Sequence, residues 1–195
     1  MDQFISQVYG LLTTPPGNLA YYVVLAFTVV GALQSSVNHW RRSGFPQGNR
    51  MVTGLALLLV LQLAQFAVAG LAWQGLLQPE TWLPPVDRFV TLASVLLIVW
   101  LWLAPEPVRL ADLALGLVFL LACAFFVASL VWWSEQAAVL YFNAAWPDWG
   151  ANWFAILILL MGGFGLLVRR PNSWGIGLAM LVLLFAGQQI GRAHV

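Results

Sequence analysis

Polar side chains inside two otherwise apolar stretches are the residues of this chain best placed for chemistry. They are Thr28, Gln34, Ser35 and Asn38 in the first stretch, and Gln62 and Gln65 in the second. Their spacing places each group on one face of a helix. Amides and hydroxyls in an apolar setting bind one another across helices or bind a ligand. We therefore predict that these side chains are interior polar contacts, either between helices or lining a polar pocket.

Other chemistry is hard to place on this chain. We find no zinc-protease, serine-hydrolase or nucleotide-binding motif, so we predict no catalytic residues, no metal and no cofactor. His39 and the single cysteine, Cys123, lack the partners that a haem or metal site needs. Glu106 and Asp112 lie in a short turn, where we expect solvated side chains. No acidic or basic residue lies deep in an apolar stretch, which disfavours a proton relay.

Long apolar stretches must position the polar residues. The sequence is 62% hydrophobic and 8% charged, whereas a soluble domain carries about 25% charged residues. A helix needs about 20 apolar residues to cross a bilayer, and each stretch is continuous, unlike the alternating strands of a membrane barrel. We predict an all-α, polytopic membrane helical bundle with six transmembrane helices, at about residues 17–38, 51–73, 88–104, 111–133, 151–168 and 174–189.

Arginine residues are distributed unevenly among the linkers between these stretches. The chain has no lysine, and alternate linkers hold six of the seven arginines that precede residue 190: Arg41, Arg42, Arg50, Arg109, Arg169 and Arg170. Arg88, beside Asp87, is the exception. Positively charged short loops stay in the cytoplasm. These arginines therefore predict a multi-pass protein of the inner (plasma) membrane whose N-terminus is extracytoplasmic.

The two ends of the chain are expected to lie outside this bundle. Residues 1–16 are predicted to form an N-terminal extracytoplasmic segment, and residues 17–189 the transmembrane domain. The last six residues, IGRAHV (190–195), resemble the translation of a common short-read sequencing adaptor. We therefore expect the natural sequence to be cut inside the sixth stretch, near Gln189, with a seventh helix beyond it.

Two stretches of the sequence resemble a known class of membrane region. They are 20–50, AYYVVLAFTVVGALQSSVNHWRRSGFPQGNR, and 168–187, VRRPNSWGIGLAMLVLLFAG. With an external N-terminus and a seventh helix, the chain resembles the seven-helix N-terminal sensor regions of bacterial multidomain histidine kinases, and in particular those of Chloroflexi-like environmental sequences. The resemblance covers most of residues 17–189, and it rests on membrane-helix patterns and not on catalytic signatures.

This resemblance implies the input region of a signal-transduction protein. Its partners would be membrane lipids, downstream cytoplasmic signalling domains and a second copy in a homodimer. The kinase chemistry would lie after the last helix, and the near-neutral net charge argues against nucleic acid as a partner. On this interpretation the loop 134–150 supplies the residues expected to contact a signal, which are Asn143, Trp146 and Trp149.

Other membrane functions stay open on the sequence alone. A small transporter or channel would need a polar path and a related second half, and uptake by reconstituted vesicles would reveal it. A retinal-binding protein would carry its lysine in the missing last helix. An enzyme acting on lipids would need clusters of His, Asp or Glu, which the sequence lacks. A simple membrane anchor for a downstream domain needs no site.

Cysteines introduced at positions 44 and 172 test the predicted orientation. Both positions lie in arginine-containing linkers, which are expected to stay in the cytoplasm. An impermeant thiol reagent added to whole cells should therefore leave both cysteines unmodified. Modification of either one would overturn the predicted orientation.

Overall fold

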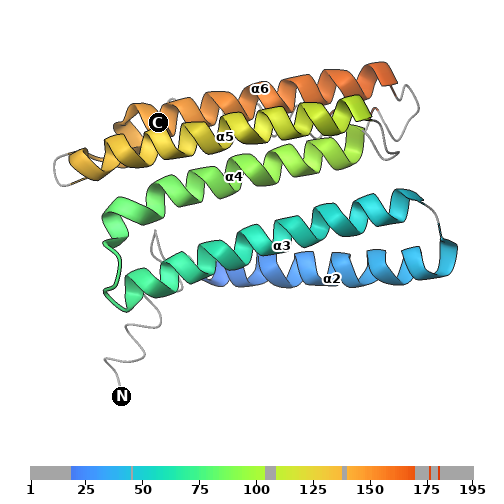
Figure 1. The fold of residues 1–195 in the computed structure, drawn as a ribbon, viewed down its shortest axis with the longest axis horizontal. Coiled ribbons are helices and arrows are strands. Elements are labelled where there is room, and N and C mark those ends of the chain that lie inside the picture. The colour runs from blue at the N-terminus through green and yellow to red at the C-terminus, as the bar shows by residue number, and fades with distance from the viewer. Residues whose placement is uncertain are drawn as a thin grey trace.

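Long antiparallel helices make up the fold. The computed structural model describes residues 19–44, 46–103, 109–137 and 140–169, together with Ile176 and Met180. Over these residues the helices are α2 Leu19–Ser43, α3 Pro46–Trp73, α4 Pro79–Leu103, α5 Arg109–Gln136, the short 3-10 helix η1 Phe142–Ala144, and α6 Trp146–Arg169. Consecutive α-helices run in opposite directions (Figure 1). The prediction of an all-α fold is confirmed.

Four of the described helices are long and apolar enough to cross a membrane. They are Gly48–Trp73, Pro79–Trp102, Arg109–Gln136 and Trp146–Val168. This number corrects our prediction of six. The predicted first stretch does form a helix, α2, which is not among these four. The stretch 174–189 lies outside the described residues except for Ile176 and Met180, and residues 1–16 and 190–195 lie outside them altogether. The four spans indicate a multi-pass membrane protein.

Proline residues mark a helix start where we expected a loop. The predicted stretches 51–73 and 88–104 leave residues 74–87 as a linker, but α4 begins at Pro79 and contains Pro84. Proline fits the first turn of a helix, but further along it leaves the carbonyl four residues earlier without its helical partner. That carbonyl belongs to Glu80, and it accepts a hydrogen bond of 2.8 Å from Trp133 Nε1 on α5. The indole therefore satisfies the carbonyl and ties α5 to α4.

Two glycines with positive φ close the short turns after α2 and α3. Gly44 has φ 65°, and its N–H donates to the Trp40 carbonyl at 2.8 Å. Gly75 has φ 75°, and beside it the N–H of Leu76 donates to the Leu71 carbonyl at 3.0 Å, as in a Schellman motif. Glycine adopts this backbone region without the strain that a Cβ would cause. These turns allow the two following helices to begin within a few residues.

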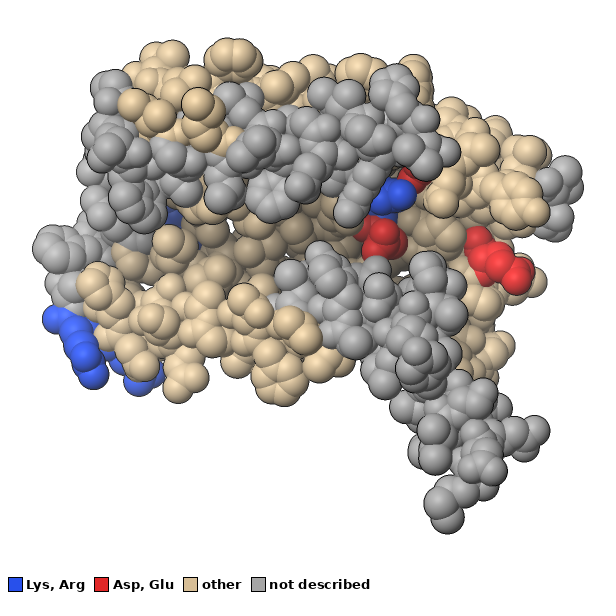
Figure 2. All heavy atoms as spheres, turned by 180° about the vertical axis from the view of Figure 1, so that it is seen from behind, with Lys and Arg blue, Asp and Glu red and all other residues tan. Residues whose placement is uncertain are grey.

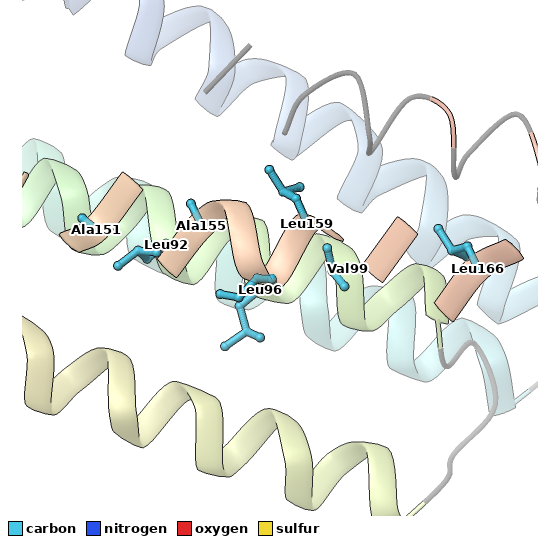
Figure 3. Close-up of a cluster of buried hydrophobic side chains, with 8 residues drawn as sticks. Leu92, Leu96, Val99, Ala151, Ala155, Leu159 and Leu166 are labelled. Carbon is cyan, nitrogen blue, oxygen red and sulfur yellow. The ribbon is translucent and has the colours of Figure 1, made fainter. Parts of the chain in front are cut away.

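The largest buried core lies between α4 and α6. Its members are Leu92, Leu96 and Val99 on α4, and Ala151, Ala155, Ile158, Leu159 and Leu166 on α6 (Figure 3). α4 also packs against α3 and α5, and α2 packs against α3. α4 is therefore the helix through which the other described elements are joined. Burial of these side chains stabilises the interface by dispersion and close packing, which replace the hydrophobic effect between helices in lipid.

Gly162→Ala should destabilise the interface between α4 and α6. A Cβ at position 162 would lie 2.6 Å from Val99 Cγ1, and a β-branched valine has little freedom to move away. Overpacking of this kind costs about 1–3 kcal/mol. Thermal unfolding in detergent micelles should therefore show a lower midpoint than that of the unmodified protein.

Gly116→Ala is the matched control for this substitution. A Cβ at position 116 would have nothing within 4 Å, so alanine there should be neutral or stabilising. Val99→Ala combined with Gly162→Ala should recover part of the loss, because it removes the two methyl groups that the new Cβ meets. A midpoint for Gly162→Ala at or above that of Gly116→Ala would contradict the close packing described here.

Candidate functional site

Charged residues gather at the two ends of the bundle. The alternating helix directions bring together the end of α2, the start of α3 and the start of α5, where Arg41, Arg42, Arg50 and Arg109 lie. We call this the arginine end, and we call the opposite one, which carries η1, the η1 end. Figure 2 shows basic side chains at the arginine end and acidic side chains towards the η1 end. Arg169 is the last residue of α6 at the arginine end, and Arg170 lies outside the described residues.

At the η1 end, an ion pair joins α4 to α6. Arg88 Nε pairs with Asp148 Oδ1, and Asn152 Nδ2 donates to the other carboxylate oxygen at 3.2 Å. The side chain of Asp148 is 9% exposed and that of Arg88 is 30% exposed, so the pair lies largely away from solvent. Removal of one partner from such a pair leaves the other charge uncompensated, and this destabilises the folded protein. We expected Arg88 at the first position of the stretch 88–104 and Asp148 in the loop 134–150. The structure instead places Arg88 well inside α4, which begins at Pro79, and Asp148 in the first turn of α6.

A second polar contact joins α3 to α4. Gln65 Nε2 donates to Asp87 Oδ1 at 2.8 Å. Gln62 lies one turn earlier on α3 and is 4% exposed. Its Oε1 has no hydrogen-bond partner within the described part of the chain. We call these three residues, Gln62, Gln65 and Asp87, the α3–α4 seam. It places polar groups within two candidate membrane spans, where such groups are expensive to bury and usually functional.

At the arginine end, three helices meet at Asp112. Its carboxylate forms an ion pair with Arg50 of α3 and accepts a hydrogen bond of 3.0 Å from Trp100 Nε1 of α4. The guanidinium carbon of Arg50 lies 4.3 Å from the centroid of the Trp100 ring, which is a cation–π contact. We expected Arg50 in a linker and Asp112 solvated in a turn. Both instead lie in helices, since α3 begins at Pro46 and α5 at Arg109.

The predicted interior contacts fall into two groups in the structure. Gln62 and Gln65 are buried on α3. The residues on α2 are all exposed, and these are Thr28, Gln34, Ser35 and Asn38. Thr28 Oγ1 donates to the carbonyl of Val24 in its own helix at 2.8 Å, which satisfies the hydroxyl locally. Gln62 and Gln65 are therefore the buried members of the predicted set, and Gln65 bonds to Asp87 of the neighbouring helix α4.

The residues predicted to contact a signal lie at the η1 end. Asn143 is exposed on η1, and Trp146 and Trp149 are exposed in the first turn of α6. The two tryptophans flank Asp148 in the sequence. The three residues therefore lie on the outside of the segment whose buried side holds the ion pair with Arg88.

The described residues provide hydrogen bonding and charge pairing but no metal site. No group of three His, Cys, Asp or Glu side chains among them is close enough to hold a metal ion.

A small cavity beside Arg88, between α4, α5 and α6, has room for about one water molecule. The prediction of no enzyme activity stays a prediction. What these contacts can do chemically is hold helices together and exchange hydrogen-bond partners.

Comparisons with known proteins identify no family for this chain. No model of a protein family matches the sequence, no curated protein matches it, and no solved structure matches the fold. The function must therefore be inferred from the sequence and from the contacts between the described helices.

Asp148→Ala should destabilise the protein by about 2–3 kcal/mol, because it leaves the charge of Arg88 without a partner between helices. Unfolding in detergent micelles measures this loss. The double variant Arg88→Met with Asp148→Leu removes both charges and should recover much of it. Glu135→Ala, at an exposed position near the end of α5, is the control and should change stability by less than about 0.5 kcal/mol. Equal effects of Asp148→Ala and Glu135→Ala would show that the ion pair does not stabilise the bundle.

Proposed function

We propose that this chain is the membrane-embedded input region of a signal-transduction protein, whose catalytic domains, those of a histidine kinase, follow its last helix. The observation that carries the proposal is the α3–α4 seam. It joins the α2–α3 pair to α4, which itself packs on α5 and α6. The seam is polar, whereas the interface between α4 and α6 is an apolar core with the ion pair of Arg88 and Asp148 at its η1 end. A signal that moves one group of helices against the other would act through this contact.

The seam has the properties of a contact with two arrangements. Gln65 is paired with Asp87, whereas the Oε1 atom of Gln62, one turn away, lacks a partner among the described residues. A buried acceptor without a donor raises the free energy of the arrangement that contains it. A shift of α3 along α4 would change which amide is paired. A ligand that binds one of two such arrangements more tightly shifts their populations.

The proposed orientation follows from the arginine end. Arginine-rich ends of membrane helices stay in the cytoplasm, so the η1 end and the N-terminus would lie outside, in a bacterial plasma membrane. Asn143, Trp146 and Trp149 would then meet an external or lipid-borne signal close to the pair between Arg88 and Asp148. A helix after those described would carry the change to cytoplasmic domains of a homodimer.

An input region fits this geometry better than a transporter, a channel or a simple anchor. A transporter or channel needs a continuous polar path, whereas the polar side chains of Gln65, Asp87, Arg88 and Asp148 bond to one another between helices. An anchor needs no polar contact between its helices, and buried Gln62 and Gln65 would only weaken it. A contact that exchanges partners is useful where two arrangements of the bundle have different outputs.

Gln65→Leu should change the output of the full-length signalling protein proposed here. The bond to Asp87 contributes about 1 kcal/mol to one arrangement, and its loss corresponds to about a fivefold change in the ratio of two states. We expect basal autophosphorylation in reconstituted vesicles to rise or fall about fivefold. Gln34→Leu makes the same change at an exposed position of α2 and should leave it unaltered.

Two results would count against this function. Autophosphorylation of Gln65→Leu equal to that of the unmodified protein would remove the seam from the mechanism. A full-length protein without a dimerisation and ATP-binding module after its last membrane helix would contradict the class of protein proposed.

A further inference from the structure

A small cavity lies between α4, α5 and α6 at the η1 end. Its walls include Arg88 and Phe89 of α4, Phe125 and Ser129 of α5, Phe142 of η1 and Pro147 of α6. Most of this lining is aromatic or apolar, and the polar side chains in it are those of Arg88 and Ser129. The space is about that of one water molecule, so a larger ligand would not fit.

Ser129 contributes the first polar side chain to the lining of this space. Ser129 is 3% exposed, and its Oγ has no hydrogen-bond partner among the described residues. Some hydroxyls of the bundle bond to a carbonyl of their own helix, as those of Thr28 and Thr53 do, whereas Ser94 Oγ, like Ser129 Oγ, has no partner among the described residues. A buried hydroxyl that makes no such bond is destabilising unless another group in the site binds it.

The guanidinium of Arg88 is the second polar group. Its bond to Asp148 uses Nε, and a guanidinium has four further N–H donors on its two Nη atoms. Arg88 lines the cavity from α4, and Ser129 lines it from α5. A donor and a hydroxyl that share a space the size of one water molecule match the needs of a bridging water, which requires two or more polar partners.

We propose that one ordered water molecule occupies this cavity and links α5 to the ion pair between α4 and α6. The water accepts a hydrogen bond from an Nη–H of Arg88 and donates a hydrogen bond to Ser129 Oγ. It thereby satisfies the buried hydroxyl and connects three helices directly beneath η1. This site does not depend on the signalling function proposed above, since it follows from the cavity and its two polar side chains.

Ser129→Ala tests the water by the sign of its effect on Tm. If the water bridges the helices, the substitution removes one of its partners, and Tm in detergent micelles should fall by about 2–4 °C. If the cavity is dry, the substitution removes a hydroxyl without a partner, and Tm should rise or stay the same. The second outcome overturns the proposal. Ser134→Ala is the matched control on α5, because Ser134 is exposed and bonds to the carbonyl of Val131.

The same substitution in a variant without Arg88 distinguishes the loss of the water bridge from any other effect of Ser129→Ala on Tm. In the double variant Arg88→Met with Asp148→Leu, the water has lost its charged donor, so Ser129→Ala should no longer lower Tm. An equal loss of Tm in both variants overturns the bridge to Arg88, because independent sites are additive.

In the unmodified protein, water-edited solid-state NMR should transfer magnetisation from water to Ser129 as well as to exposed Ser134. Transfer to Ser134 alone overturns the proposal.

Discussion

A charged or polar group inside a membrane helix must find its partner within the protein or in trapped water, because lipid provides none. This constraint decides where the helices of the chain touch. The pair of Arg88 and Asp148 joins α4 to α6 at one end, and the cluster of Arg50, Trp100 and Asp112 joins α3, α4 and α5 at the other. Apolar packing fills the space between these two ends.

The same constraint explains why α4 is the central helix. Its proline-containing start leaves the Glu80 carbonyl without a helical partner, and Trp133 of α5 supplies the missing N–H. Asp87 and Arg88 are adjacent in the sequence and therefore point towards different neighbours, so one bonds to α3 and the other to α6. A single stretch of α4 thus carries polar contacts to three helices.

The contacts of α4 differ in kind, and this difference gives the bundle its proposed mechanical character. The interface with α6 combines a tight apolar core, including the contact of Gly162 with Val99, and an ion pair. The interface with α3 includes one paired glutamine and one whose acceptor lacks a partner in the described chain. Both interfaces are closely packed, since Gly54 of α3 lies against Leu101 of α4 as closely as Gly162 lies against Val99. The exchange of hydrogen-bond partners that we propose for an input region would therefore take place at the polar groups of the α3–α4 seam.

The sequence by itself determined that the chain is helical and lies in a membrane, because continuous apolar runs of about 20 residues can satisfy their backbone in lipid only as helices. It also determined that arginines such as Arg41 and Arg109 lie at one end, since alternate linkers of an antiparallel bundle meet there. Helical spacing correctly placed Gln62 and Gln65 on a common face, but spacing says nothing about what covers that face. Only the tertiary structure decided that these two are buried while Gln34 is exposed. It alone paired Arg88 with Asp148, because residues 60 apart in the chain come together only once the helices have packed.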